Sequence, residues 1–172
     1  MHKKKPVLTT ERLLLRSYRD TDLEPMVSLL RNEEIRKNFV IPDLPTMEDA
    51  VKMFDKLKAF SISDDHFEYG VTLNGELIGF VNDVTIDGET IELGYVIRPD
   101  MKNRGCASEA LSAAINELFR MGYATARCGF FEDNIASRRV MEKCGMHSVD
   151  KTEVVAHQGI SRRCLYYEIE RP

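Results

Sequence analysis

The chain has 172 residues, a length that suits one domain and is short for two. Its 43% hydrophobic and 30% charged residues are typical of a soluble globular protein, and no apolar stretch approaches the roughly 20 residues that span a bilayer. The net charge of −4 argues against nucleic acid as the main partner and permits a cationic substrate. We therefore predict a single domain over residues 1–172, with no nucleic-acid or membrane partner.

The first part of the chain is predicted to form one strand and three helices. Alternating apolar residues predict a strand over residues 7–18. Thr21 and Glu24 have the spacing of a capping box and predict the start of the first helix. A short second helix is expected over residues 32–39, and Thr46 is expected to cap a third, amphipathic helix.

The hydrophobic period then changes from helical to alternating. Strands are predicted over residues 67–73, 77–86 and 91–97, joined by the tight turns Asn74–Gly75 and Asp87–Gly88. These segments together predict a three-stranded antiparallel meander.

The last part of the chain alternates helices and strands. Helices are expected over residues 105–120 and 134–143, and strands over residues 124–131, 146–155 and 160–170. The whole order predicts an α/β protein with a mixed sheet flanked by helices.

The loop between the strand at 91–97 and the helix at 105–120 is a candidate anion site. Gly105 lets the backbone approach a phosphate without a Cβ in the way, and Lys102 and Arg104 add positive charge. The start of the helix offers unpaired backbone N–H groups. The residues alone leave a second interpretation open, in which the glycine merely eases an ordinary connection.

The remaining motifs argue against nucleotide and metal sites. Neither Gly-x-Gly-x-x-Gly nor Gly-x-x-x-x-Gly-Lys-Ser/Thr occurs. The four cysteines are irregularly spaced, and the histidines have no metal-ligand spacing, so we expect reduced thiols and no metal. The basic residues 1–6 lack the apolar region of a secretion signal, which favours the cytoplasm.

Two segments resemble the motifs of the GNAT N-acetyltransferases. Lys102-Asn103-Arg104-Gly105-Cys106-Ala107 resembles their pyrophosphate loop, Gln/Arg-x-x-Gly-x-Gly/Ala, with lysine in the first place. Residues 134–146 are similar to the family's Asn-x-x-Ser … Glu-Lys-x-Gly-Phe segment, with Met146 in place of phenylalanine. Residues 10–16 are similar to the start of the RimJ/RimL branch, which includes ribosomal-protein N-terminal acetyltransferases.

This resemblance implies a GNAT fold with a mostly antiparallel sheet of about seven strands. It also implies acetyl-CoA as donor, a primary amine as acceptor, and direct attack with neither a covalent enzyme intermediate nor a metal. The branch favours a protein N-terminal amine. The alternatives are a small amine, of the aminoglycoside or polyamine type, and a non-catalytic acyl-CoA-binding regulator. Dimers are common in this family, so a homodimer is one alternative for the assembly.

The resemblance also assigns cofactor contacts. In the family the strand at 91–97 splays from its neighbour near Val96, which leaves main-chain N–H groups for the thioester and the pantetheine arm. Asn134 matches a pantetheine or substrate contact and is also a good helix N-cap, and the two roles can coexist. The implied cofactor-binding residues are Val96, Ile97, Lys102, Asn103, Arg104, Gly105, Cys106, Ala107, Ser108, Asn134 and Ser137.

Two residues are candidates for catalysis. Glu92 lies in the strand that borders the acetyl group in the family, so it is a candidate base, with a surface carboxylate as the alternative. Many relatives carry a tyrosine as acid four residues after the serine, where this chain has Met141. Ser137 remains as hydroxyl donor or holder of a water, or as a serine that only touches the cofactor. We expect Ser137 and Met141 to face the cofactor together.

For three further residues the family resemblance implies no role, and the prediction rests on the local sequence. Asn82 and Asp83 interrupt an apolar strand, so either is a candidate to hold an acceptor ammonium if it faces the cleft. Tyr95 is predicted to be a core aromatic residue.

Overall fold

The computed structural model describes residues 5–172, so most of the basic N-terminal segment on which we based the absence of a secretion signal lies outside the described residues. The strands are β1 (Leu8–Thr9), β2 (Leu13–Arg16), β3 (Glu68–Leu73), β4 (Glu76–Asp87), β5 (Thr90–Ile97), β6 (Thr125–Phe131), β7 (His147–His157) and β8 (Ile160–Glu170). The α-helices are α1 (Leu23–Leu30), α2 (Glu33–Asn38), α3 (Met47–Ile62), α4 (Cys106–Met121) and α5 (Ile135–Lys143). Two 3₁₀ turns, η1 (Asp20–Asp22) and η2 (Pro99–Met101), complete the elements.

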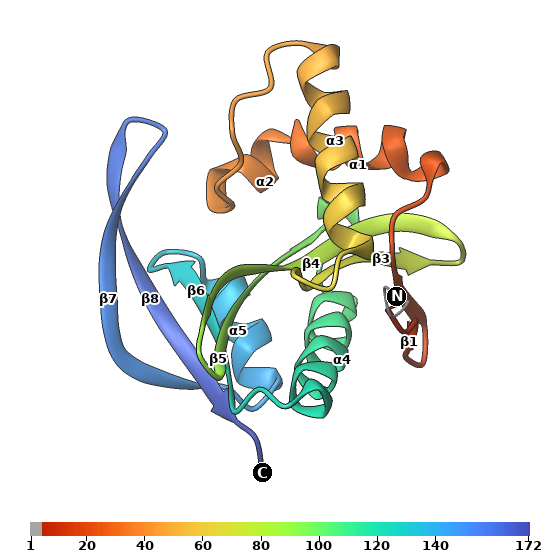
Figure 1. The fold of residues 1–172 in the computed structure, drawn as a ribbon. Coiled ribbons are helices and arrows are strands. Elements are labelled where there is room, and N and C mark those ends of the chain that lie inside the picture. The colour runs from red at the N-terminus through yellow and green to blue at the C-terminus, as the bar shows by residue number, and fades with distance from the viewer. Residues whose placement is uncertain (1–4) are drawn as a thin grey trace.

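The strands form one sheet in the order β1-β2-β3-β4-β5-β6-β8-β7 (Figure 1). The expected α/β class and the mostly antiparallel sheet are confirmed, with eight strands in place of about seven. Only β5 and β6 pair in parallel, and their register covers Thr90–Leu93 against Thr125–Cys128. Beyond these residues the two strands diverge and open the sheet at its centre.

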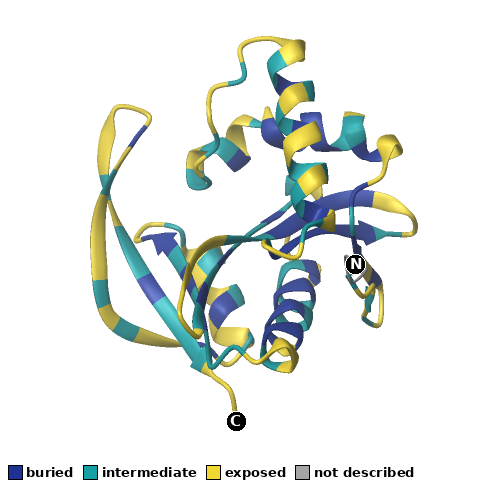
Figure 2. Ribbon diagram, viewed as in Figure 1, coloured by how far each residue is buried: buried dark blue, intermediate teal, exposed yellow. Residues whose placement is uncertain are grey.

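Two hydrophobic layers cover the sheet. Helices α1, α2 and α3 lie on one side, and α4 and α5 lie on the other (Figure 1). Figure 2 shows buried residues concentrated in the central strands and along α4, whereas the β7–β8 hairpin is mostly exposed or half-buried. None of the described helices is long and apolar enough to cross a bilayer. All four cysteines are free thiols, as expected.

Local sequence signals placed most elements correctly. Asn32 caps α2 by accepting a hydrogen bond from the Ile35 backbone N–H at 3.0 Å, and Thr46 caps α3 through a capping box with Asp49. In the first turn of the meander Asn74 and Gly75 have φ values of +51° and +82°, the left-handed conformation that this hairpin type requires. The expected meander of β3, β4 and β5 is confirmed.

The prediction of one strand over residues 7–18 was wrong, because a tight turn divides it into β1 and β2. The Glu109 carboxylate of α4 accepts hydrogen bonds from the Thr10 hydroxyl at 2.5 Å and from the Arg12 backbone N–H at 2.9 Å. The Arg12 guanidinium also donates to it at 2.7 Å. This carboxylate lies about a hundred positions away in the sequence, so residues 7–18 alone do not reveal the turn.

The predicted capping box of Thr21 and Glu24 was also wrong. The turn η1 precedes α1, and Asp22 is the residue that organises it. The buried Asp22 carboxylate pairs with Arg16 at 2.7 Å and accepts a hydrogen bond from the Arg19 backbone N–H at 2.8 Å. Arg16 of β2 is buried, and a buried charge must be paired. Its pairing with Asp22 therefore explains why Asp22, and not Glu24, stabilises this turn.

Candidate active site

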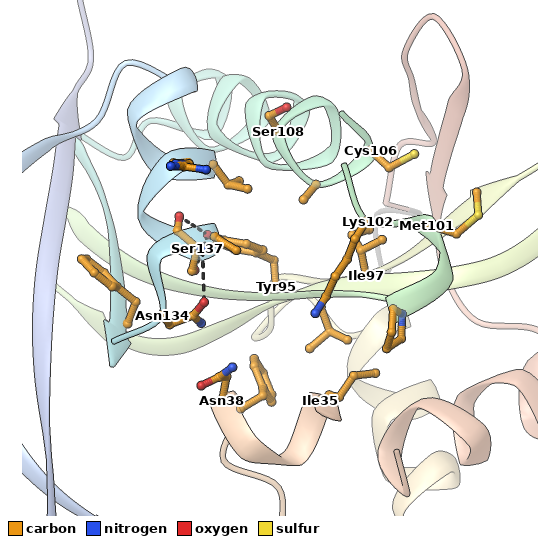
Figure 3. A pocket seen from close by; sticks show the side chains of 18 of the residues that line it. Ile35, Asn38, Tyr95, Ile97, Met101, Lys102, Cys106, Ser108, Asn134 and Ser137 are labelled. Carbon is orange, nitrogen blue, oxygen red and sulfur yellow. Dashed lines mark hydrogen bonds between the residues drawn. The ribbon is translucent and has the colours of Figure 1, made fainter. Parts of the chain in front are cut away.

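A cavity of about 410 Å³ opens where β5 and β6 diverge (Figure 3). Its size lies in the range of small-molecule sites, roughly 300–1,000 Å³. Residues 93–97 of β5 form its floor, and the starts of α4 and α5 form one wall. One side of α2 forms the opposite wall. The cavity therefore lies between segments that are far apart in the sequence.

The loop before α4 has the geometry expected of an anion site. Gly105 is the N-cap of the 16-residue α4, has φ +79° and makes no side-chain cap. A Cβ added there would lie 3.3 Å from the Arg12 guanidinium. The first N–H groups of α4 are thus left for an incoming acceptor, which suits a phosphate. A residue with a side chain would be strained in this conformation.

All the predicted cofactor residues except Arg104 line the cavity. Arg104 lies in the same loop with its side chain exposed, beside the cavity and not in its wall. Lys102 lines the cavity, and its ammonium forms an ion pair with Glu34 of α2, so this pair joins the two walls. The expected splay near Val96 is present, because pairing with β6 ends at Leu93.

The start of α5 brings Asn134 and Ser137 to the cavity. The Asn134 side-chain oxygen accepts a hydrogen bond from the Ser137 backbone N–H at 3.2 Å, so Asn134 is the N-cap of α5. Both residues also line the cavity. The structure therefore places Asn134 where the capping role and a contact with a ligand are compatible.

Tyr95 is the functional candidate that the sequence interpretation missed. Its hydroxyl lies 2.7 Å from Ser137 Oγ and donates to the Ser137 backbone oxygen at 3.0 Å, inside the cavity (Figure 3). Burial raises the pKa of the Tyr95 phenol well above its usual range, so the phenol stays protonated. The alternation of side chains along a strand could have indicated this position. Leu93, Tyr95 and Ile97 share one face of β5, and Ile97 was already a predicted cofactor residue.

The expectation that Met141 faces the cofactor was wrong. Its side chain is fully buried, at 0% exposure, in the hydrophobic cluster that includes Leu111 and Leu118 of α4. The cavity side of α5 carries Ser137 and Val140. Burial beneath α4 stabilises an apolar side chain more than a position in an open cavity does.

Glu92 lies at the edge of the site. The cavity wall begins at the next residue, Leu93, and Glu92 itself is not part of it. Its carboxylate accepts a hydrogen bond from the Thr85 hydroxyl at 2.9 Å. A role as the base would require the carboxylate to leave this partner or to act through water, and that role stays a prediction.

The polar residues of β4 behave differently from one another. Asp83 turns away from the cavity, where its carboxylate accepts from the Phe67 backbone N–H at 2.8 Å and faces His66. The Asn82 side-chain oxygen is buried with no hydrogen-bond partner among the described residues, and it lies against Gly94, a residue of the cavity floor. Neither side chain lines the cavity itself.

The β7–β8 hairpin holds the α2 wall in place. His157 Nε2 lies 2.7 Å from the Arg36 backbone oxygen. Arg162 donates to the Lys37 backbone oxygen and, at 3.1 Å, to the Asn38 side-chain oxygen. No sequence motif indicated these contacts, which join residues more than 120 positions apart.

Comparison with known proteins gives a consistent result. The acetyltransferase (GNAT) domain family matches residues 12–147. The uncharacterized N-acetyltransferase YnaD of Bacillus subtilis is 30% identical over 164 residues, covering 92% of this chain and 87% of the relative. A GNAT-family acetyltransferase from Bacillus anthracis has 27% identity and a TM-score of 0.81, covering 96% of this chain and 98% of that one.

A more distant structure has the same fold. RimL, the ribosomal L7/L12 alpha-N-protein acetyltransferase solved in complex with coenzyme A, superposes with a TM-score of 0.85. The match covers 96% of this chain and 98% of RimL. At 15% identity this similarity is one of fold.

Proposed function

This chain belongs to the GNAT acetyltransferase family and is an acetyl-CoA-dependent N-acetyltransferase, and we propose that its acceptor is the N-terminal amine of a protein. The similarity in fold to RimL, the ribosomal L7/L12 alpha-N-protein acetyltransferase, supports this acceptor. The α2 wall supports it as well, because its residues Ile35 and Asn38 line the cavity and are not among the predicted cofactor contacts. The proposal places the reaction in a single cytoplasmic domain.

The loop at residues 102–107 is proposed to hold the pyrophosphate of acetyl-CoA, which supplies the acetyl group. The observation that carries this assignment is Gly105, whose positive φ and bare Cα open the start of α4 to an anion. Lys102 lines the same cavity, where its ammonium pairs with Glu34. Asn134 and the main chain of Val96 and Ile97 are proposed to position the pantetheine arm, since all three line the same cavity.

We propose that three residues assist the removal of the amine proton and the departure of the thiolate. Glu92 removes the proton of the incoming amine, directly or through water, and the amine attacks the thioester carbonyl without a covalent enzyme intermediate. Tyr95 and Ser137 are proposed to donate hydrogen bonds to the leaving thiolate, for which the Tyr95 hydroxyl turns its hydrogen away from the Ser137 backbone oxygen. The Tyr95 phenol takes the place of the phenol that relatives carry at the position of Met141, and burial keeps it protonated for this task. These steps need no metal.

A screen of acceptors tests the proposal. Release of coenzyme A is measured with acetyl-CoA and either peptides with different free N-terminal residues or a panel of polyamines and aminoglycosides. We expect turnover of peptides, and none of the same peptides after N-terminal acetylation. Turnover of small amines alone would contradict the proposed acceptor. Binding of acetyl-CoA without turnover of any amine would instead indicate a regulator.

A further inference from the structure

We propose that Asn38 recognises the acceptor by donating its amide N–H to the carbonyl oxygen next to the reacting amine, and that Arg162 is the residue that positions it. This inference rests on the proposed function and deepens it. It gives a preference for amines followed by a carbonyl group, as in a peptide N-terminus.

Asn38 lies on the wall of the cavity that has no predicted cofactor contact. It is the last residue of α2, and its side chain lines the cavity. Figure 3 shows Asn38 facing Asn134 and Tyr95 across the pocket. An acceptor that enters beside α2 would therefore meet Asn38 before it reaches the floor at β5.

The orientation of the Asn38 amide follows from its partner. Arg162 Nη2 lies 3.1 Å from the side-chain oxygen of Asn38. A guanidinium has only donors, so the amide atom that faces it must be the oxygen. The amide nitrogen then points to the opposite side, toward the cavity, and no acceptor among residues 5–172 engages it. The cavity wall thus presents a fixed donor.

Arg162 is itself held firmly enough to act as a positioning residue. Its side chain is 15% exposed, and Nη2 donates to Asp133 at 2.6 Å. The guanidinium also donates to the Lys37 backbone oxygen and lies 3.9 Å above the Phe131 ring. Three acceptors and one ring fix its plane, which a lysine ammonium would not reproduce.

An oriented donor distinguishes two classes of amine. In a peptide N-terminus the reacting nitrogen and the first carbonyl oxygen are separated by only two carbon atoms. Polyamines have no oxygen at this position, and aminoglycosides have only hydroxyl or ether oxygens there, without the planar carbonyl. An analogue that lacks the hydrogen-bond acceptor has a lower kcat/KM, because the donor of the protein is left unpaired when the analogue binds. Asn38 therefore gives selectivity for peptide N-termini over simple amines.

A matched pair of acceptors tests this inference. One is a short peptide with a free N-terminus, and the other is its analogue with an (E)-alkene in place of the first peptide bond, which keeps the shape and loses the carbonyl. We expect the wild-type protein to prefer the peptide by roughly 10-fold in kcat/KM, the effect of one hydrogen bond. In Asn38→Asp the inward atom becomes an oxygen. We expect this variant to lose the preference through a higher KM for the peptide, with a change of less than about threefold for the alkene.

Arg162→Lys tests the positioning role. We expect it to lower the preference for the peptide through KM while kcat with saturating peptide is retained. Arg163→Lys is the matched control, because Arg163 pairs with Glu132 on the exposed surface. It should leave the preference unchanged. Thermal unfolding of each variant shows that it is folded.

Two outcomes would overturn the inference in distinguishable ways. Asn38 would have only a structural role under either of two results. One is equal kcat/KM for the peptide and the alkene in wild type, and the other is an equal loss of kcat/KM for both acceptors in Asn38→Asp. The proposed function would then stand, since the peptide is still acetylated. If the protein acetylates polyamines or aminoglycosides but neither the peptide nor its alkene analogue, the proposed function is overturned. This inference is then overturned as well.

Discussion

The two walls of the cavity are built in opposite ways. The first, the cofactor wall, is the side where we propose that acetyl-CoA binds; it includes the floor and consists of residues 93–108 and the start of α5, with a backbone conformation at Gly105 and a helix cap at Asn134 as its main features. The second, the acceptor wall, is the side where we propose that the amine binds; it is one side of α2, which has only six residues and is tied to the β7–β8 hairpin. The two features named for the first wall depend on groups within a few residues of chain, whereas the contacts that hold α2 against the hairpin span 120 or more positions.

This difference separates two kinds of recognition. A phosphate is bound by backbone N–H groups, which any sequence that permits the loop geometry can supply. An acceptor is distinguished by side chains, whose orientation depends on partners from elsewhere in the fold. We therefore expect substitutions in the cofactor wall to abolish binding of acetyl-CoA, and those in the acceptor wall to change the choice of amine.

The largest effect is expected at Gly105. In Gly105→Glu the side chain and its negative charge would face the bound pyrophosphate, so the affinity for acetyl-CoA should fall roughly 100-fold or more, since like charges at close range repel by ~4 kcal/mol. Titration calorimetry measures this. The matched control is Gly122→Glu at the other end of α4, where φ is +106° and no heavy atom lies within 4 Å of the added Cβ. Unchanged affinity in a folded Gly105→Glu variant would contradict the assigned loop.

The next effect is expected at Glu92, which directly precedes the cavity-lining residue Leu93. If Glu92 accepts the proton of the amine, Glu92→Gln should lower kcat by ~10²–10⁴-fold with little change in affinity for acetyl-CoA. Thr85→Val removes only the hydroxyl that Glu92 contacts and serves as the control. A loss below about threefold would mean that Glu92 is not the base.

A smaller loss is expected at Tyr95. Tyr95→Phe removes the phenol that lies against Ser137, so kcat should fall by roughly 10-fold, below the ~10²–10³-fold typical of an oxyanion-hole donor, because the neighbouring Ser137 hydroxyl remains. Ser137→Ala should cost less, since it removes only the partner of that phenol. Tyr167→Phe is the control, because its hydroxyl contacts Glu142 outside the cavity. A single-turnover assay separates this step from product release. Equal kcat in Tyr95→Phe and Tyr167→Phe would remove Tyr95 from the mechanism.

The smallest effect on catalysis is expected at Met141, which supports the cofactor wall from beneath. Met141→Tyr would place a larger, polar side chain in a fully buried site, so the free energy of unfolding should fall by ~1–3 kcal/mol. Denaturant unfolding measures this loss. In the folded fraction kcat should be unchanged, because the phenol would not reach the cavity. A higher kcat in this variant would show that the residue faces the leaving thiolate after all.

Much of the fold was predictable from short-range signals. The caps at Asn32 and Thr46, the turn at Asn74–Gly75 and the glycine at the start of α4 each depend on groups within about four residues. The same holds for most of the cofactor wall. Its residues could be proposed from a motif because their chemistry depends on local backbone geometry.

The errors had a common cause in long-range contacts. The strand over residues 7–18 is divided because Glu109 lies beside it, and Asp22 replaces the predicted capping pair because Arg16 is buried next to it. Met141 was assigned to the cavity by helical spacing and by the tyrosine that many relatives carry at its position. The Met141 side chain packs instead in the hydrophobic core with residues of α4. The side chain beside Ser137 is that of Tyr95, which belongs to β5.

The sequence by itself therefore determined the family, the order of the elements and the loop that suits a pyrophosphate. Only the tertiary structure decided which phenol lies beside Ser137 and which atom of Asn38 faces the cavity. The physical reason is that hydrogen bonds within a helix cap or a tight turn depend on neighbouring residues. The orientation of a side chain in a cavity depends instead on partners brought together by burial of the core, such as Arg162, 124 positions after Asn38.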